Sequence, residues 1–328
     1  MMQEIQQAHG ALPRSVMIEL TNECQLACTT CPRDKIFAKD YDIGTMSLAN
    51  FKHIFSQFEQ SIHTLDLTGL GESLMHPDIF QIIRWVRSRR EVHIYLTTNT
   101  ILLNETNIHK LDEDPVDTLC VSVDGVSNDQ LRNIRGLKLD PLRKRVRRAI
   151  AALRPRCEFI LCTVLVEENI RDMVRFVELA AELGIERLSL KPLNLVATAI
   201  PSSYYRRYMT DDYLALAAEA VSVGESLGVS VQVFKIGTYS CTFPWDPLYV
   251  TWDGFLVPCC AKPFPKRMHF GNLLERSIHD ILGSAQLKNF RDELVNSPKG
   301  PSFCSKCHIM NKTMFADEPG RSAAPILS

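Results

Sequence analysis

The chain has 328 residues, of which 45% are hydrophobic and 23% charged, and its formal net charge is -1. This length can bury one large core with a smaller appendage, and the near-zero charge excludes a general electrostatic attraction to nucleic acid. The first residues lack the basic-then-apolar order of a secretory signal, and no run approaches the roughly 18 apolar residues of a membrane span. We therefore expect a cytoplasmic protein with no nucleic-acid or membrane partner.

Short runs rich in β-branched residues alternate with amphipathic stretches along the first part of the chain. The runs predict six strands, at residues 15–20, 64–70, 92–98, 118–124, 159–166 and 187–193. Helical periodicity follows Met46 and Pro77, and another such stretch stops at Gly184. Because strand and helix alternate, we expect an α/β fold with a parallel sheet and right-handed crossovers, curved into a partial (β/α)6 TIM-like barrel.

After about residue 230 the pattern changes to a small cysteine-rich module. Asp253 and Gly254 separate two alternating runs, as in a hairpin turn. We predict an N-terminal arm at residues 1–14, the barrel at 15–235, an auxiliary module at 236–312 and a loose tail at 313–328.

The eleven cysteines are unevenly distributed. An odd number in a cytosolic chain argues against a disulfide framework and favours metal or cluster ligation. Three lie within apolar runs, where a cysteine behaves as a small hydrophobe: Cys120, Cys157 and Cys162. The others form a front set with CxxxCxxC spacing, Cys24, Cys28 and Cys31, and a back set, Cys241, Cys259, Cys260, Cys304 and Cys307. The spacing of the back set permits a four-cysteine zinc site as well as an iron–sulfur cluster.

The CxxxCxxC motif beyond the first strand resembles the signature of the radical S-adenosylmethionine (radical SAM) superfamily. The resemblance extends to the ends of later strands, in "GLGES", "TTN", "SVDG", "RNIRG", "TVLVEEN" and "LSLKPLN". It departs from the family at Thr30, where an aromatic residue is usual, and at Thr100, where the family has glycine. The resemblance implies a [4Fe-4S] cluster on Cys24, Cys28 and Cys31 whose open iron binds S-adenosylmethionine. It also implies cofactor contacts at Gly71, Glu72, Asn99, Ser122, Asp124, Arg135 and Asn169.

The back set resembles the twitch domain, a shortened relative of the SPASM domain. Thr313 stands where the last cysteine of a full SPASM module would be. The resemblance implies one auxiliary [4Fe-4S] cluster on Cys241, Cys259, Cys304 and Cys307. Either member of the Cys259–Cys260 pair could ligate; we choose Cys259 and leave Cys260 as a spare thiol.

The implied chemistry is cleavage of S-adenosylmethionine to a 5'-deoxyadenosyl radical that takes a hydrogen atom from carbon. We expect an oxidoreductase that acts on a small polar metabolite, such as a sugar, aminocyclitol or nucleotide sugar, with oxidation through the auxiliary cluster. A small substrate is favoured because only some fourteen residues precede the first strand. Flavodoxin or ferredoxin is the expected type of electron donor. The candidate catalytic residues are Cys260, Lys191 and Glu167.

Three alternatives stay open. A spare thiol at Cys260 could donate a hydrogen atom, which would make the enzyme an epimerase. The enzyme could instead be a maturase of ribosomally made peptides. The third alternative is a non-catalytic zinc-binding protein.

Overall fold

The structure is a computed structural model. It describes residues 11–33, 37–154, 156–198, 204, 211–234, 241–297, 300–307 and 309–310. Most of the predicted N-terminal arm, the predicted tail at 313–328 and Thr313 lie outside these residues.

One ten-stranded sheet forms the scaffold, in the order β10-β9-β8-β1-β2-β3-β4-β5-β6-β7. From β1 to β7, neighbouring strands are parallel and follow one another in the chain. The six predicted strands are confirmed, and a seventh, β7, extends the parallel series. Their bounds are β1 Ser15–Ile18, β2 Thr64–Asp66, β3 His93–Thr98, β4 Thr118–Ser122, β5 Glu158–Leu165, β6 Arg187–Pro192 and β7 Ser230–Val233.

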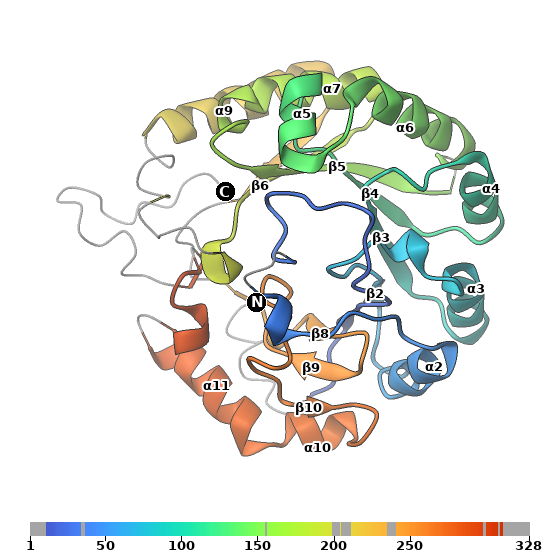
Figure 1. Cartoon of the computed structure of the whole chain (residues 1–328), viewed down its shortest axis with the longest axis vertical. Helices are drawn as coiled ribbons and strands as arrows, with labels where there is room; N and C mark the ends of the chain where they lie inside the picture. The colour runs from blue at the N-terminus through green and yellow to red at the C-terminus, as the bar shows by residue number, and fades with distance from the viewer. Residues whose placement is uncertain are drawn as a thin grey trace.

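Helices cover the outer face of this curved sheet (Figure 1). They are α2 Leu48–Ser56, α3 Ile79–Arg89, α4 Glu105–Glu113, α5 Asn128–Arg135, α6 Leu139–Leu153, α7 Met173–Leu183 and α9 Asp211–Leu227. Helix α7 ends at Gly184, which has a φ of 75°, as its sequence predicts. In the part of the chain that the structure describes, no helix has the length and apolar character needed to span a bilayer.

Burial alternates along the central strands. In β4, Leu119 and Val121 are buried, whereas Cys120 and Ser122 are half-buried. Because successive side chains of a strand point to opposite faces, the buried set packs against the helices and the half-buried set faces the inside of the arc. This inner face is where we expect the site.

The cysteine-rich module continues the same sheet. Strand β8 (Leu248–Val250) pairs in parallel with β1, and β9 (Phe255–Val257) and β10 (Gly271–Asn272) follow as antiparallel neighbours. The predicted hairpin is confirmed, with Gly254 at a φ of 89° between β8 and β9. Helices α10 (Ile278–Leu282) and α11 (Ala285–Asn296) lie on the outer side of these strands (Figure 1). The domain boundary at 235/236 stays a prediction, since one sheet runs through both modules.

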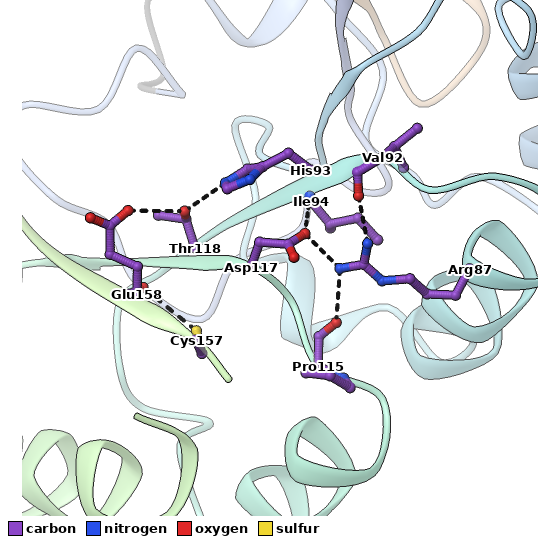
Figure 2. Close-up of polar contacts among 9 residues, drawn as sticks. All are labelled: Arg87, Val92, His93, Ile94, Pro115, Asp117, Thr118, Cys157 and Glu158. Atoms are coloured by element: carbon purple, nitrogen blue, oxygen red, sulfur yellow. Dashed lines mark hydrogen bonds and ion pairs between the residues drawn. The ribbon is translucent and has the colours of Figure 1, made fainter. Parts of the chain in front are cut away.

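Polar side chains join β3, β4 and β5 where these strands begin (Figure 2). Asp117 Oδ2 accepts hydrogen bonds from the guanidinium of Arg87, at 2.5 Å, and from the backbone N–H of Ile94, at 2.6 Å. Thr118 links His93 on one side to Glu158 on the other. This edge is opposite the strand ends that carry the candidate site, so we assign the network to stability.

Candidate active site

The front cysteines lie in the loop after β1, which crosses the inside of the arc (Figure 1). Cys24, Cys28 and Cys31 are all half-buried. Burial raises the pKa of Cys28 to about 11; the charge of Arg135 opposes this increase, and the other two cysteines add to it. Burial likewise raises the pKa of Cys31. Three thiols close enough to interact electrostatically, beside the cation of Arg135, fit an anionic cluster in which iron takes the place of the thiol protons.

Gly71 lets the loop after β2 pack directly against this cysteine loop. A Cβ atom at Gly71 would lie 2.4 Å from the carbonyl oxygens of Thr21 and Glu23, which is closer than non-bonded atoms can approach. The backbone N–H of Glu72 donates to the carbonyl of Glu23 at 2.8 Å. The structure therefore gives Gly71 a packing role, and its predicted contact with the cofactor stays a prediction.

The Glu72 carboxylate is buried at the end of β3. It accepts hydrogen bonds from the Thr98 hydroxyl and from the backbone N–H of Asn99, both at 2.8 Å. Burial raises the pKa of Glu72 against these hydrogen bonds and the charge of Arg135. The Asn99 amide donates to Cys24 Sγ at 3.6 Å. Glu72 and Asn99 thus lie directly beside the front cysteines.

Asp124, Arg135 and Asn169 form a second buried group, at the ends of β4 and β5. Asp124 pairs with Arg135 at 2.6 Å and accepts from the backbone N–H of Val164 at 2.8 Å. The Asn169 amide donates to the carbonyls of Asp124 and Val164 and accepts from the N–H of Val166. Asp124 and Asn169 therefore orient Arg135 and the strand ends, and their predicted direct contacts with the cofactor stay predictions.

The back cysteines enclose a small apolar cavity. Cys241, Cys259, Cys304 and Cys307 line it together with Val196, Phe243, Pro258, Phe290, Leu294, Phe303 and Met310. Burial raises the pKa of Cys241 to about 12 and also raises the pKa of Cys304 and Cys307; neighbouring cysteines add to each increase. Cys260 is not among the lining residues. The choice of Cys259 over Cys260 as a ligand stays a prediction, and the place of Cys259 in this cavity supports it.

The chemistry of the two donor sets fits iron–sulfur clusters. Among the residues that the structure describes, no three His, Cys, Asp or Glu side chains converge closely enough to hold one metal ion. Cysteines of a cubane each bind a different iron and need not converge in this way, and an apolar wall is compatible with an electron-transfer cluster.

A cluster of reactive side chains on the inner face contains the predicted Lys191 and Cys260 together with three residues that sequence reasoning missed. We call it the inner-face cluster: Asp66, Cys120, Cys162, Lys191 and Cys260. Burial raises the pKa of Asp66, and the neighbouring thiol of Cys162 together with burial raises the pKa of Cys120. The partner thiols of Cys162 and Cys260 lower the pKa of these two cysteines against burial, and the charge of Lys191 acts to lower the pKa of all four groups. Cys120 and Cys162 act on each other as a close thiol pair, which raises the pKa of the first and lowers that of the second, and Cys259 and Cys260 do the same.

Cys120 and Cys162 are therefore not the core hydrophobes that their apolar runs predicted. Both are half-buried on the inner face, whereas Cys157 is buried as expected. The strict alternation in "TLCVSV" was the available signal. It places Cys120 on the same face as Ser122, which faces Cys162 in the strand register.

Besides Cys260, the predicted catalytic residues are Lys191 and Glu167, which lie at or after the ends of the neighbouring strands β6 and β5. Lys191, at the end of β6, lies over the Phe234 ring at 5.2 Å. Glu167 is exposed after β5, and its backbone N–H donates to the Tyr204 hydroxyl. Glu167 is not part of the inner-face cluster, so its catalytic role stays a prediction.

Glu19, also missed by the sequence analysis, connects the two modules. Its buried carboxylate accepts from the N–H of Leu70 at 2.7 Å, the Tyr249 hydroxyl at 2.9 Å and the N–H of Trp252 at 3.4 Å. Burial raises the pKa of Glu19 from 4.5 to about 7 despite these three hydrogen bonds. One carboxylate thereby joins β1, the loop before Gly71 and the β8–β9 hairpin.

Two family models match the chain at these sites. The model of the Radical SAM superfamily matches residues 18–180, and the SPASM model, an iron-sulfur cluster-binding domain, matches residues 241–308. The chain belongs to the radical SAM superfamily. It carries a C-terminal SPASM domain, and its cofactors are S-adenosylmethionine, the [4Fe-4S] cluster that binds it and auxiliary iron–sulfur centres.

Radical SAM relatives of several kinds resemble this chain. It is 28% identical over 173 residues to the AdoMet-dependent heme synthase of Methanosarcina barkeri. The matched region is 52% of this chain and 48% of that protein, so this chain spans about half the length of that relative. It is 25% identical over 327 residues to the PqqA peptide cyclase of Ruegeria pomeroyi, covering 91% and 80%. Streptococcus suis SuiB bound to precursor peptide SuiA shares the fold, with a TM-score of 0.70 and 15% identity over 92% of this chain and 70% of that one.

Proposed function

We propose that this radical SAM enzyme is an oxidoreductase that modifies a peptide. The observation that carries the proposal is the position of the inner-face cluster. Cys260 adjoins the back cysteine Cys259, and Cys162 lies within electrostatic range of both Lys191 and Asp124, which follows β4. A substrate held there would lie between the two cysteine sites.

A peptide substrate is supported by two of the resemblances. The Ruegeria pomeroyi relative, which matches 91% of this chain, is named for cyclising a peptide, and SuiB was crystallised with its precursor peptide. Within the described residues, β7 and β10 are the two edges of an open sheet, which can admit a chain segment more easily than a closed barrel can. This proposal departs from our expectation of a small polar metabolite.

The chain's own residues would hold the cofactors. Cys24, Cys28 and Cys31 would ligate one cluster, and Glu72, Asn99 and Arg135 lie beside them to bind the polar groups of S-adenosylmethionine. Cys241, Cys259, Cys304 and Cys307 would ligate the auxiliary cluster. When bound and reduced, the cofactor supplies a radical that removes hydrogen from unactivated carbon; a one-electron donor such as flavodoxin or ferredoxin belongs to this proposal.

The inner-face cluster would then handle the substrate. Lys191 and Asp66 offer an ammonium and a carboxylate on opposite sides of the arc, and either could hold or move a proton on the bound substrate. The Cys260 thiol has a weak S–H bond on the same face. Its position there favours one second candidate, an epimerase in which Cys260 returns a hydrogen atom to the substrate carbon.

The test is an oxygen-free assay of reconstituted protein with S-adenosylmethionine, a reductant and short peptides encoded near the gene. We expect substrate-dependent 5'-deoxyadenosine and a peptide lighter by two hydrogens, and neither when Cys24, Cys28 and Cys31 are all replaced by Ala. That variant should also fall from about eight irons per chain to about four.

The Cys260→Ala variant separates the two candidates. In a peptide oxidase it keeps the lighter product, whereas in an epimerase it still forms 5'-deoxyadenosine but yields no epimer. Turnover of sugars or aminocyclitols, with none of any peptide, would refute the peptide proposal and restore the small-metabolite expectation.

A further inference from the structure

Lys262 places a positive charge beside the cavity of the back cysteines. Its ammonium lies 4.5 Å from the centroid of the Phe303 ring, and Phe303 lines that cavity with the four cysteines. Within the described part of the chain, Lys262 forms no ion pair with a carboxylate. Its charge is thus available to whatever the cysteines bind.

The electrostatic effects of Lys262 and the cysteines are reciprocal. Burial lowers the pKa of Lys262, and the thiols of Cys304 and Cys259 act in the opposite direction. Burial raises the pKa of Cys304, and Lys262 opposes that rise. The ammonium therefore lies within electrostatic range of two candidate cluster ligands.

Asn194 supplies a hydrogen-bond donor from the barrel side. Its amide nitrogen lies 3.8 Å from Cys307 Sγ, and its carbonyl oxygen accepts from the N–H of Val196 at 3.0 Å. Because Val196 also lines the cavity, the second contact fixes the orientation of the amide. Asn194 follows β6, so it connects the end of the inner face to the back cysteines.

We propose that Lys262 and Asn194 raise the reduction potential of the auxiliary iron–sulfur cluster. Reduction adds one negative charge to the cluster, and a nearby cation or an N–H donor to a ligand sulfur stabilises the more negative state. In an apolar pocket this effect is stronger than in water. The inference rests on the cofactor set proposed above, and it would make the cluster a better acceptor for the electron left by substrate oxidation.

The experiment uses the full chain with Cys24, Cys28 and Cys31 replaced by Ala, so that only the auxiliary cluster contributes a signal. Its midpoint potential is measured by anaerobic titration with electron paramagnetic resonance. We expect a negative shift for Lys262→Met, a potential near the parent value for Lys262→Arg, and a smaller negative shift for Asn194→Ala. Lys288→Met, an exposed lysine on α11, is the matched control and should leave the potential unchanged.

Iron content distinguishes the possible failures. If the background itself binds no iron, the proposed ligand set is wrong. If the background and Lys262→Met bind equal iron and have equal potentials, the ligand set stands and this inference is refuted. If Lys262→Met, Lys262→Gln and Asn194→Ala all lose iron, these residues are structural, which also overturns it.

Discussion

Thr100 combines backbone strain with a position beside the candidate site. It has a φ of 74°, is fully buried, and its hydroxyl has no hydrogen-bond partner among the described residues. A β-branched residue is disfavoured in this left-handed region, which glycine adopts without steric strain. The departure from the family's glycine is therefore a strained substitution. The strain is adjacent to Asn99, whose amide contacts Cys24.

Thr100→Gly should stabilise the protein. The change removes strain of about 1–2 kcal/mol and an unpaired hydroxyl, while it loses a buried methyl group and adds unfolded-state entropy. We expect a net gain of about 1 kcal/mol in urea denaturation. Thr163→Gly, in β5, is the control and should destabilise because its buried hydroxyl donates to the carbonyl of Val123. A lower midpoint for Thr100→Gly would contradict this account.

At the level of residues, the sequence indicated the candidate ligands more clearly than the residues around them. The spacing of Cys24, Cys28 and Cys31 is a local signal, so it could be recognised without a structure. The alternation in "TLCVSV" indicated that Cys120 shares a face with Ser122, but it did not indicate which face is open, because strands of a helix-covered parallel sheet are commonly apolar on both faces. Only the curvature of the sheet decides which face is open.

At the level of elements, Asp117 holds the start of β4 against β3. Its carboxylate accepts from Arg87 and from the N–H of Ile94, a pairing that no helix or strand propensity encodes. The six strands themselves were predictable from their β-branched runs and their spacing. The ends of the strands were less predictable. Strands β1 and β2 are shorter than their apolar runs, and the backbone N–H groups of Thr68 and Leu70 beyond β2 donate to the carboxylates of Asp66 and Glu19.

Asp117→Ala should destabilise the fold without disturbing the site. Asp117 is about one-third exposed, so we expect a loss of about 1 kcal/mol, below the range for buried charged hydrogen bonds. Urea denaturation measures the loss, and iron content per chain should stay unchanged. Asp112→Ala is the control on a more exposed ion pair, with Arg156 at 3.6 Å, and should have almost no effect. Loss of iron in Asp117→Ala would link this edge to the site.

At the level of the whole molecule, Glu19 makes the stability of the fold depend on pH. Its pKa is about 7 in the folded protein, so ionisation costs more there than in the unfolded chain. The free energy of unfolding should therefore fall as pH rises from about 4.5 to about 7, by about 3 kcal/mol in total. The stabilisation that comes from a neutral Glu19 is fully present below about pH 4.5 and is lost as the pH rises through about 7.

The comparison of wild type with Glu19→Gln isolates this effect. The difference between their unfolding free energies should change by about 2 kcal/mol between about pH 5.5 and about pH 8, to the disadvantage of wild type. Asp253→Asn removes the charge that contributes least to the raised pKa of Glu19, so in that background the pH-dependent difference that Glu19→Gln makes should persist almost in full. A constant difference across pH would show that Glu19 is ionised throughout.

The contacts between the two modules could not be predicted from the sequence, and the reason is physical. The hydrogen bond between Tyr249 and Glu19 joins residues 230 positions apart, and no local pattern encodes such a pair. The same applies to the cavity of the back cysteines, which combines loops from both modules. What could be predicted was that each cysteine set is a site; how the sheet brings them together required the structure.

The pairing of β8 with β1 also sets the order of assembly during translation. The first strand stays at an open edge until Leu248–Val250 leaves the ribosome, because that segment is its second neighbour. A nascent chain shorter than this exposes the backbone of β1 and leaves Glu19 without Tyr249. The complete sheet beneath the first three cysteines therefore depends on a segment that is synthesised late, after the rest of the parallel series.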